Sequence, residues 1–147
     1  MQFEEAIDII SELFRIKQWT ADGAGERHAI IDDDLEIKVF QENLDNIVLQ
    51  GVFGDVMSGP SQISMNEAKL KYLLQANFIR LIHQNDVLSI DAKTDRLCTT
   101  RQIAIDKITT DELLDEVENF VQNIDFWDVT AKRKRSSSMS PLLGLLR

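Results

Sequence analysis

The sequence predicts a single α+β domain in which three helices accompany an antiparallel β-sheet, in the order α-β-β-β-α-β-β-α. Two observations lead to this prediction. Segments with apolar residues at helical spacing stand near the beginning, in the middle and near the end of the chain, and short segments with alternating or β-branched residues stand between them. The 147 residues are enough for one domain with a hydrophobic core.

The first helix is predicted over residues 3–17, where apolar residues recur at i, i+3, i+4 and i+7. Gly23 and Gly25 then interrupt the helical pattern. Three short strands follow, at 28–31, 35–39 and 47–53. The third of these strands is apolar on both faces, so we expect one face to lie on the helices and the other to need a cover from outside the chain.

The central helix is predicted over residues 63–83 and is the element around which the prediction is built. It begins with a capping box in which Ser64 and Glu67 each satisfy a backbone amide, an arrangement worth about 1 kcal/mol. Its apolar residues cover most of the circumference rather than one stripe. A helix of this kind must be covered on more than one side. The predicted sheet covers one side, so we expect a second copy of the chain to cover the other.

The last three elements are a hairpin with strands at 87–90 and 97–105, and a closing helix. That helix begins with a second capping box, formed by Thr109 and Glu112. Apolar residues line one of its faces and acidic residues occupy the others. Hairpin and closing helix complete the predicted α+β order.

The composition changes at residue 132, where basic residues are followed by serines and a leucine-rich end. We therefore expect a domain at residues 1–131 and a basic, flexible C-terminal tail at 132–147. The tail holds five basic and no acidic residues, which leaves 11 basic and 25 acidic side chains in the domain, a net charge of −14. A domain this acidic repels phosphate backbones, so nucleic acid is not a predicted partner.

The sequence shows no membrane or export signal. No apolar run approaches the roughly 18 residues of a membrane-spanning helix. The first residues are acidic where a signal peptide would be basic. We therefore expect a cytoplasmic protein without a membrane span.

Candidate catalytic and metal-binding residues are few. Cys98 is the single cysteine and lies in a predicted strand, so we interpret it as a packing residue. The aspartates at 32–34 are interpreted as a solvated turn, because they lack the spacing of a calcium loop. Residues 54–61 have the glycine spacing of a phosphate-binding loop but carry Pro60 where lysine is required. The sequence therefore predicts no catalytic residue, no metal site and no cofactor.

Three passages carry a resemblance to a known family. They are the segment 73–78 (LLQANF), the strand 87–91 (VLSID) with the following strand to 105, and the acidic closing helix 113–124. In element order, spacing and charge, residues 1–128 resemble the class I chaperones of bacterial type III secretion, the Tir-chaperone family.

The resemblance implies a bacterial, non-enzymatic homodimer that binds the N-terminal segment of secreted effector proteins in extended form and keeps them soluble for export. The export ATPase is a further candidate partner. The implied dimer interface consists of Leu70, Leu73, Leu74, Asn77, Phe78, Leu81 and Val87. The implied effector-binding residues are Ile9, Leu13, Ile16, Ile37, Val39, Leu49 and Val52.

Two alternatives remain open from the sequence. The chain can be a small acidic dimerisation or regulatory module that binds folded cytosolic partners, or an enzyme acting on a bound small molecule. The basic tail can contact an effector, the export machinery or a membrane surface. An extended ligand would leave a long protease-protected segment, whereas a folded partner would not. A metal or nucleotide bound to the purified protein would indicate an enzyme.

Overall fold

A computed structural model describes residues 1–23, 25–32, 35–55, 67–83, 85–91, 94 and 96–132, and the structural statements below refer to these residues. The helices are α1 (Phe3–Phe14), α2 (Glu67–His83) and α3 (Thr110–Lys132). The strands are β1 (Thr20–Ala21), β2 (Arg27–Asp32), β3 (Leu35–Asn43), β4 (Asn46–Asp55), β5 (Asp86–Asp91) and β6 (Arg96–Ala104).

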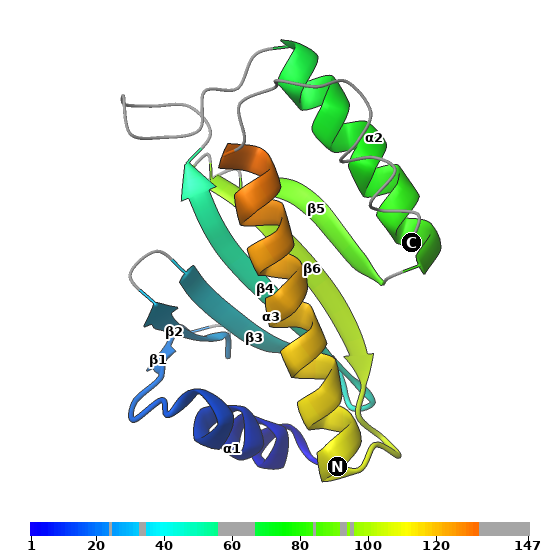
Figure 1. Cartoon of the computed structure of the whole chain (residues 1–147). Coiled ribbons are helices and arrows are strands. Elements are labelled where there is room, and N and C mark those ends of the chain that lie inside the picture. Colours follow the sequence, from blue (N-terminus) through cyan, green and yellow to red (C-terminus); the bar gives the residue numbers. More distant parts are fainter. Residues whose placement is uncertain are drawn as a thin grey trace.

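The strands form one antiparallel sheet in the order β1-β2-β3-β4-β6-β5 (Figure 1). This confirms the predicted α+β class and the order of the helices and strands, with one addition. The two-residue strand β1 was not predicted; it pairs Thr20 with His28 on β2. Two residues are too few to show an alternating pattern, so no sequence signal predicts this strand.

The first helix ends earlier than predicted, at Phe14. Arg15 takes the left-handed conformation (φ 56°, ψ 40°), and its N–H donates to the carbonyl of Glu12 at 3.3 Å. The N–H of Ile16 donates to the carbonyl of Ser11 at 2.8 Å. These two bonds end the helix in a Schellman motif. Glycine usually occupies the left-handed position of this motif, which Arg15 occupies here. Apolar residues at helical spacing continue past Phe14, but the backbone leaves the helical conformation at Arg15.

The closing helix begins as predicted. The N–H of Thr109 donates to Glu112 Oε2 at 2.8 Å, and the N–H of Glu112 donates to Thr109 Oγ1 at 3.2 Å, so the second capping box is confirmed. Ser64 of the first capping box lies outside the described residues, as do the aspartates at 33–34 and residues 133–147. Helix α3 extends to Lys132, across the predicted boundary between domain and tail.

The hydrophobic core lies between the sheet and the helices α1 and α3. In Figure 1, α3 crosses one face of the sheet and α1 lies beside the beginning of α3. The largest fully buried side chains come from both layers: Trp127, Phe120, Ile10, Ile37, Ile47, Leu49, Leu73, Ile105, Leu113 and Ile124.

The second face of β4 differs from the prediction. One face of this strand was expected to need a cover from outside the chain. The face away from the helices is that of Val48 and Val52, whose side chains are only 8% and 1% exposed. The register places Phe40 of β3 beside Val48 and Cys98 of β6 beside Val52. Cross-strand neighbours on the same face of a sheet lie close enough to shield one another. The expectation of an outside cover was therefore wrong for these two residues.

Helix α3 lies directly against Gly51 of β4. A Cβ atom at this position would clash with Cδ1 of Ile124 and would lie 3.3 Å from its Cγ1. The absence of a side chain at residue 51 therefore allows Ile124 to sit directly on the strand.

We expect Gly51→Ala to lower the free energy of unfolding by about 1–2 kcal/mol, because the added methyl group overpacks a buried contact. Ile124→Val deletes the Cδ1 atom that the methyl group would meet. This change alone costs about 1 kcal/mol, and the double variant should be more stable than the sum of the two effects predicts. Urea denaturation of the four proteins measures the coupling; strict additivity would contradict the close approach.

Candidate interaction surfaces

Helix α2 exposes a continuous apolar stripe. Leu70, Leu74, Phe78 and Leu81 follow one another at i, i+4, i+8 and i+11, and all four are exposed, Leu74 to 59% and Phe78 to 69%. Residues at this spacing lie on one side of a helix. We call these four residues the α2 stripe. A row of large apolar side chains this exposed is typical of a surface that binds another protein.

The neighbouring strand β5 also exposes apolar side chains, one on each face of the strand. Val87, which belongs to the predicted dimer interface, is 45% exposed. Ile90 on the same strand is also exposed, and the sequence analysis did not single it out. Five of the seven predicted interface residues, the α2 stripe and Val87, are thus accessible to a partner.

The two remaining residues of the predicted interface, Leu73 and Asn77, do not belong to the exposed stripe. Leu73 is buried on the core side of α2, next to Ala76, so its assignment to an interface is corrected. Asn77 lies between the stripe and the buried side. Its Nδ2 donates to the carbonyl of Leu88 at 3.3 Å, and its Oδ1 accepts from the N–H of Leu88 at 3.0 Å.

Asn77 therefore closes one edge of the sheet. Strand β5 is the last strand on its side, so its outer amides and carbonyls are open to a further strand. The amide of Asn77 pairs with both outer groups of Leu88 as a neighbouring strand would. This side chain joins α2 to the sheet and obstructs strand addition at β5.

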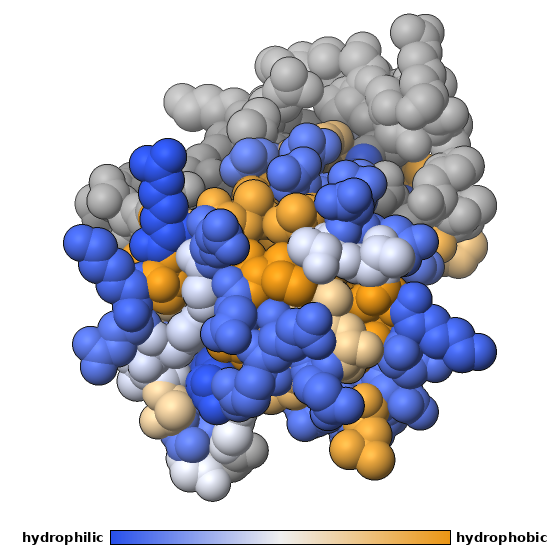
Figure 2. All heavy atoms as spheres, turned by 90° about the horizontal axis from the view of Figure 1, so that it is seen from below, coloured by the Kyte–Doolittle hydropathy of each residue, from blue (hydrophilic) through white to orange (hydrophobic). Residues whose placement is uncertain are grey.

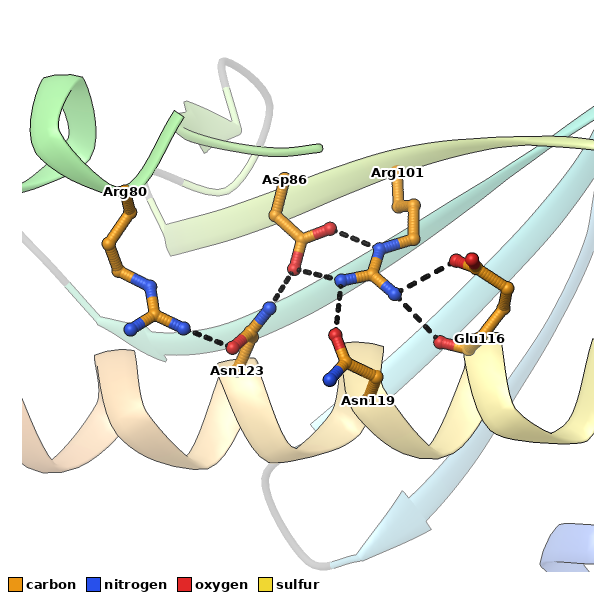
Figure 3. Close-up of polar contacts among 6 residues, drawn as sticks. All are labelled: Arg80, Asp86, Arg101, Glu116, Asn119 and Asn123. Carbon is orange, nitrogen blue, oxygen red and sulfur yellow. Dashed lines mark hydrogen bonds and ion pairs between the residues drawn. The ribbon is translucent and has the colours of Figure 1, made fainter. Parts of the chain in front are cut away.

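A buried ion pair joins the two hairpin strands on the side that faces α3 (Figure 3). Arg101 of β6 donates through Nη2 to Asp86 Oδ2 at 2.9 Å and through Nε to Asp86 Oδ1. The register places the two residues directly opposite each other. Both side chains are almost fully buried. A buried pair of this kind is tolerated only when its remaining donors and acceptors are satisfied.

Residues of helix α3 satisfy the remaining donors and acceptors of this ion pair. Nη1 of Arg101 donates to the backbone carbonyl of Glu116 at 2.9 Å and to its Oε2 at 3.1 Å, and Nη2 donates to Asn119 Oδ1 at 2.8 Å. Asn123 donates through Nδ2 to Asp86 Oδ2. The ion pair therefore ties the β5–β6 hairpin to three turns of α3, as Figure 3 shows.

Arg80 brings α2 into the same cluster. Its Nη2 donates to Asn123 Oδ1, and its guanidinium lies 4.4 Å from the ring centre of Phe126. Burial lowers the pKa of Arg80, and the nearby Asp86 carboxylate opposes this effect. We call Arg80, Asp86, Arg101, Glu116, Asn119 and Asn123 the polar cluster. The sequence analysis missed it because its members are distant in sequence and follow no motif.

The residues implied to bind an effector fall into two groups. Ile9, Leu13 and Ile16 are half-buried at α1 and just after it, where a partner can reach them. Figure 2, which looks at the molecule from the side of α1, shows hydrophobic side chains at the surface between hydrophilic ones.

The other implied effector-binding residues are corrected by the structure. Ile37, Val39, Leu49 and Val52 are at most 1% exposed. The first three belong to the core beneath α1 and α3, because alternate residues of these strands face the helices. A partner cannot contact them while the domain is folded.

A pocket of about 600 Å³ opens near the end of α1. It is lined by Phe14 and the segment that follows it, by Thr20 of β1, by four residues of β2 and by Glu36 of β3. Trp19 Nε1 donates to Ser11 Oγ at 2.6 Å, which ties the segment back to the helix. Ile30, one of the lining residues, is 73% exposed. We call this cavity the β2 pocket.

The pocket lies beside an open strand edge. Strand β1 pairs with β2 only at Arg27 and His28. From Ala29 onwards, β2 has no described neighbour on the side away from β3. Among the described residues, none pairs with the outward amides and carbonyls of this part of β2, where a further strand could be added.

The described part of the chain offers little for chemistry. It contains no group of three or more His, Cys, Asp or Glu side chains able to hold a metal ion. None of its helices is long and apolar enough to cross a membrane. Cys98 is buried, Ser89 Oγ lies 3.0 Å from its sulfur, and burial raises the pKa of the thiol. A raised pKa disfavours the reactive thiolate, which agrees with a packing role for Cys98.

We expect Arg101→Leu to lower the free energy of unfolding by about 3–5 kcal/mol, because it leaves the Asp86 carboxylate buried without its main partner. Arg101→Leu with Asp86→Leu should cost less than Arg101→Leu alone, since neither charge then remains. Glu116→Gln is the control: this side chain is half exposed and its loss should cost under about 1 kcal/mol. Denaturation midpoints test the order, and a small effect of Arg101→Leu would show that the cluster does not hold the helices.

Solved structures with the same fold were found by structural comparison. The SchA chaperone in complex with the effector HopA1 gives a TM-score of 0.61 at 16% identity, covering 86% of this chain and 92% of that chain. The ExsC–ExsE complex gives 0.65 at 13% identity, covering 89% and 97%. The Yersinia pestis type III secretion chaperone SycH, in complex with a fragment of YscM2, gives 0.55 at 13% identity, covering 87% and 98%.

Sequence comparison identifies the family. Among curated proteins, none matches the chain by sequence. The family model of the Tir chaperone protein (CesT) family matches residues 6–128, which include all three helices and all six strands described above except their outermost residues. The chain therefore belongs to the Tir chaperone protein (CesT) family.

Proposed function

We propose that the protein is a homodimeric type III secretion chaperone that binds the N-terminal segment of one or more effectors in extended form and keeps them soluble for export. The observation that carries the proposal is the pair of unoccupied surfaces, the α2 stripe and the open edge of β2, on a chain of the Tir chaperone family. Structures with this fold include chaperone–effector complexes. In this role the protein acts in the bacterial cytoplasm, catalyses no reaction and hands its client to the export ATPase.

The α2 stripe is suited to a second copy of the chain. If α2 of one copy packs against α2 of a second copy around a two-fold axis, each copy contributes its stripe to the interface, and apolar residues contact apolar residues. The polar cluster and Asn77 hold α2 in one position, so the stripe is presented in a fixed geometry. Burial of Leu74 and Phe78, the two most exposed members, contributes about 1.5–3 kcal/mol for each side chain.

The client is proposed to bind at the other end of the sheet. Asn77 obstructs the outer edge of β5, so the stretch of β2 from Ala29 onwards is the accessible edge. An extended client segment can pair with this edge through its backbone and place apolar side chains against Ile9, Leu13 and Ile30. Backbone pairing requires no particular client sequence, which suits a chaperone for several effectors.

Leu74→Asp or Phe78→Asp is expected to convert the dimer to a monomer, because two copies of an unpaired charge in an apolar interface cost several kcal/mol. Gln75→Asp adds the same charge to an exposed position of α2 outside the stripe and should leave the dimer intact. Light scattering coupled to gel filtration measures the mass. An unaltered dimer for both stripe variants would place the interface elsewhere.

Co-expression with the N-terminal segment of an effector from the same bacterium is expected to give a stable complex with two copies of this chain. Limited proteolysis should leave a long client segment protected that is digested when free. A folded partner would show no such segment, which separates the proposal from the regulatory-module alternative.

The client surface is tested in the same complex. Ile30→Asp should weaken client binding about tenfold or more, because a buried apolar contact becomes charged. Leu44→Asp makes a similar change at the exposed turn between β3 and β4 and should have no effect. Since both side chains are exposed in the free chain, neither change should affect folding. Equal binding by the two variants would contradict a client site at β2.

A further inference from the structure

Two cationic side chains line the β2 pocket without an ion-pair partner among the described residues. They are Arg15 and Lys17, both exposed, in the segment that follows α1. Glu36 is the acidic residue of the lining, and its Oε1 lies 3.2 Å from His28 Nδ1. Among the described residues, no acidic side chain forms an ion pair with either cation.

The local charge is positive although the domain is strongly acidic. The end of α1 contributes about half a negative elementary charge, and Glu36 contributes one. The two cations outweigh both. At physiological salt a charge is felt over about 8 Å, so an entering group responds mainly to the charges that line the pocket.

The backbone conformation of Arg15 is one in which glycine would be more stable. Its φ of 56° lies in the left-handed region, where glycine is free of steric cost. Among the described residues it is the single non-glycine residue with positive φ. Strained residues persist where the surrounding structure or a function requires their side chain. Here the strained residue is also one of the two unpaired cations of the pocket.

We infer that the β2 pocket binds a carboxylate side chain, Asp or Glu, of an extended client segment that pairs with the open edge of β2. The inference rests on the proposed function and adds a requirement on the client: an acidic residue flanked by apolar ones. The apolar neighbours pack on Ile30 and Phe14, and the carboxylate pairs with Arg15 and Lys17. The strand edge beside the cations favours a peptide over a free anion, because only a peptide uses both features.

The test uses the full-length chain and two fluorescein-labelled ten-residue peptides of alternating isoleucine and threonine. One peptide carries a central glutamate and the other a lysine at the same place. Fluorescence anisotropy should show about tenfold tighter binding of the glutamate peptide, a preference that decreases with added salt. Methylation of every second backbone nitrogen should abolish binding of both peptides, since it prevents strand pairing.

Three variants locate the preference. Arg15→Gly should remove most of the preference while raising the urea midpoint of unfolding, because glycine relieves the strained φ. A loss of preference in a more stable protein cannot result from unfolding. Lys17→Glu should remove or reverse the preference. Lys107→Glu makes the same charge change at the turn before α3, near the other end of α1, and should leave the preference unchanged.

Equal binding of the glutamate and lysine peptides, or no binding of either, would overturn the inference. A preference that survives Arg15→Gly and Lys17→Glu together, or that Lys107→Glu removes equally, would also overturn it. Capture of an effector in co-expression, combined with equal peptide binding, would refute the carboxylate site and leave the chaperone function standing. Failure to capture any effector would refute the chaperone function itself.

Discussion

The buried pairing of Arg101 with Asp86 is the constraint on which the arrangement of the helices depends. Two charges removed from water lose more hydration energy than their attraction returns unless every donor and acceptor is satisfied. Here both carboxylate oxygens accept hydrogen bonds and all three guanidinium nitrogens donate them, to residues of β5 and α3. Arg80 extends the set to α2. The pair therefore contributes little net stability, but its hydrogen-bond network joins α3 and, through Arg80, α2 to the hairpin.

A fixed α2 gives the two ends of the sheet different properties. At the β5 end, Asn77 pairs with the outer backbone groups of Leu88, and the α2 stripe faces outward. At the β2 end, the two-residue strand β1 covers only part of the edge, and the pocket opens beside the uncovered part. Side-chain contacts dominate the first surface and backbone groups dominate the second. A symmetric partner suits the first, and an extended chain of variable sequence suits the second.

The sequence predicted local structure well and solvent exposure poorly. Periodicity and the capping box at Thr109 located the helices and all but one of the strands, because these signals act within a few residues. The sequence could not show that Leu73 is buried and Leu74 exposed, since a helix that is apolar all round does not show which side meets the sheet. The assignment of Ile37 to the effector site came from the family resemblance, although the apolar–charged alternation of residues 35–39 is typical of a strand with one buried face. The polar cluster joins residues up to 43 positions apart, and no local pattern reports such contacts.

In the proposed dimer, the position of α2 determines how far a client has to reach to occupy both β2 edges. From β2 to β5 the sheet spans four inter-strand gaps, about 19 Å. In the proposed dimer the two α2 helices pack about 10 Å apart, and each adds a similar distance to its own β5. The two β2 edges then lie on the order of 65 Å from each other. An extended chain covers this span with about 20 residues at roughly 3.3 Å each. A folded domain of about 100 residues has a radius of gyration near 13 Å and cannot reach both edges. Occupation of both edges by one client therefore requires an unfolded N-terminal segment.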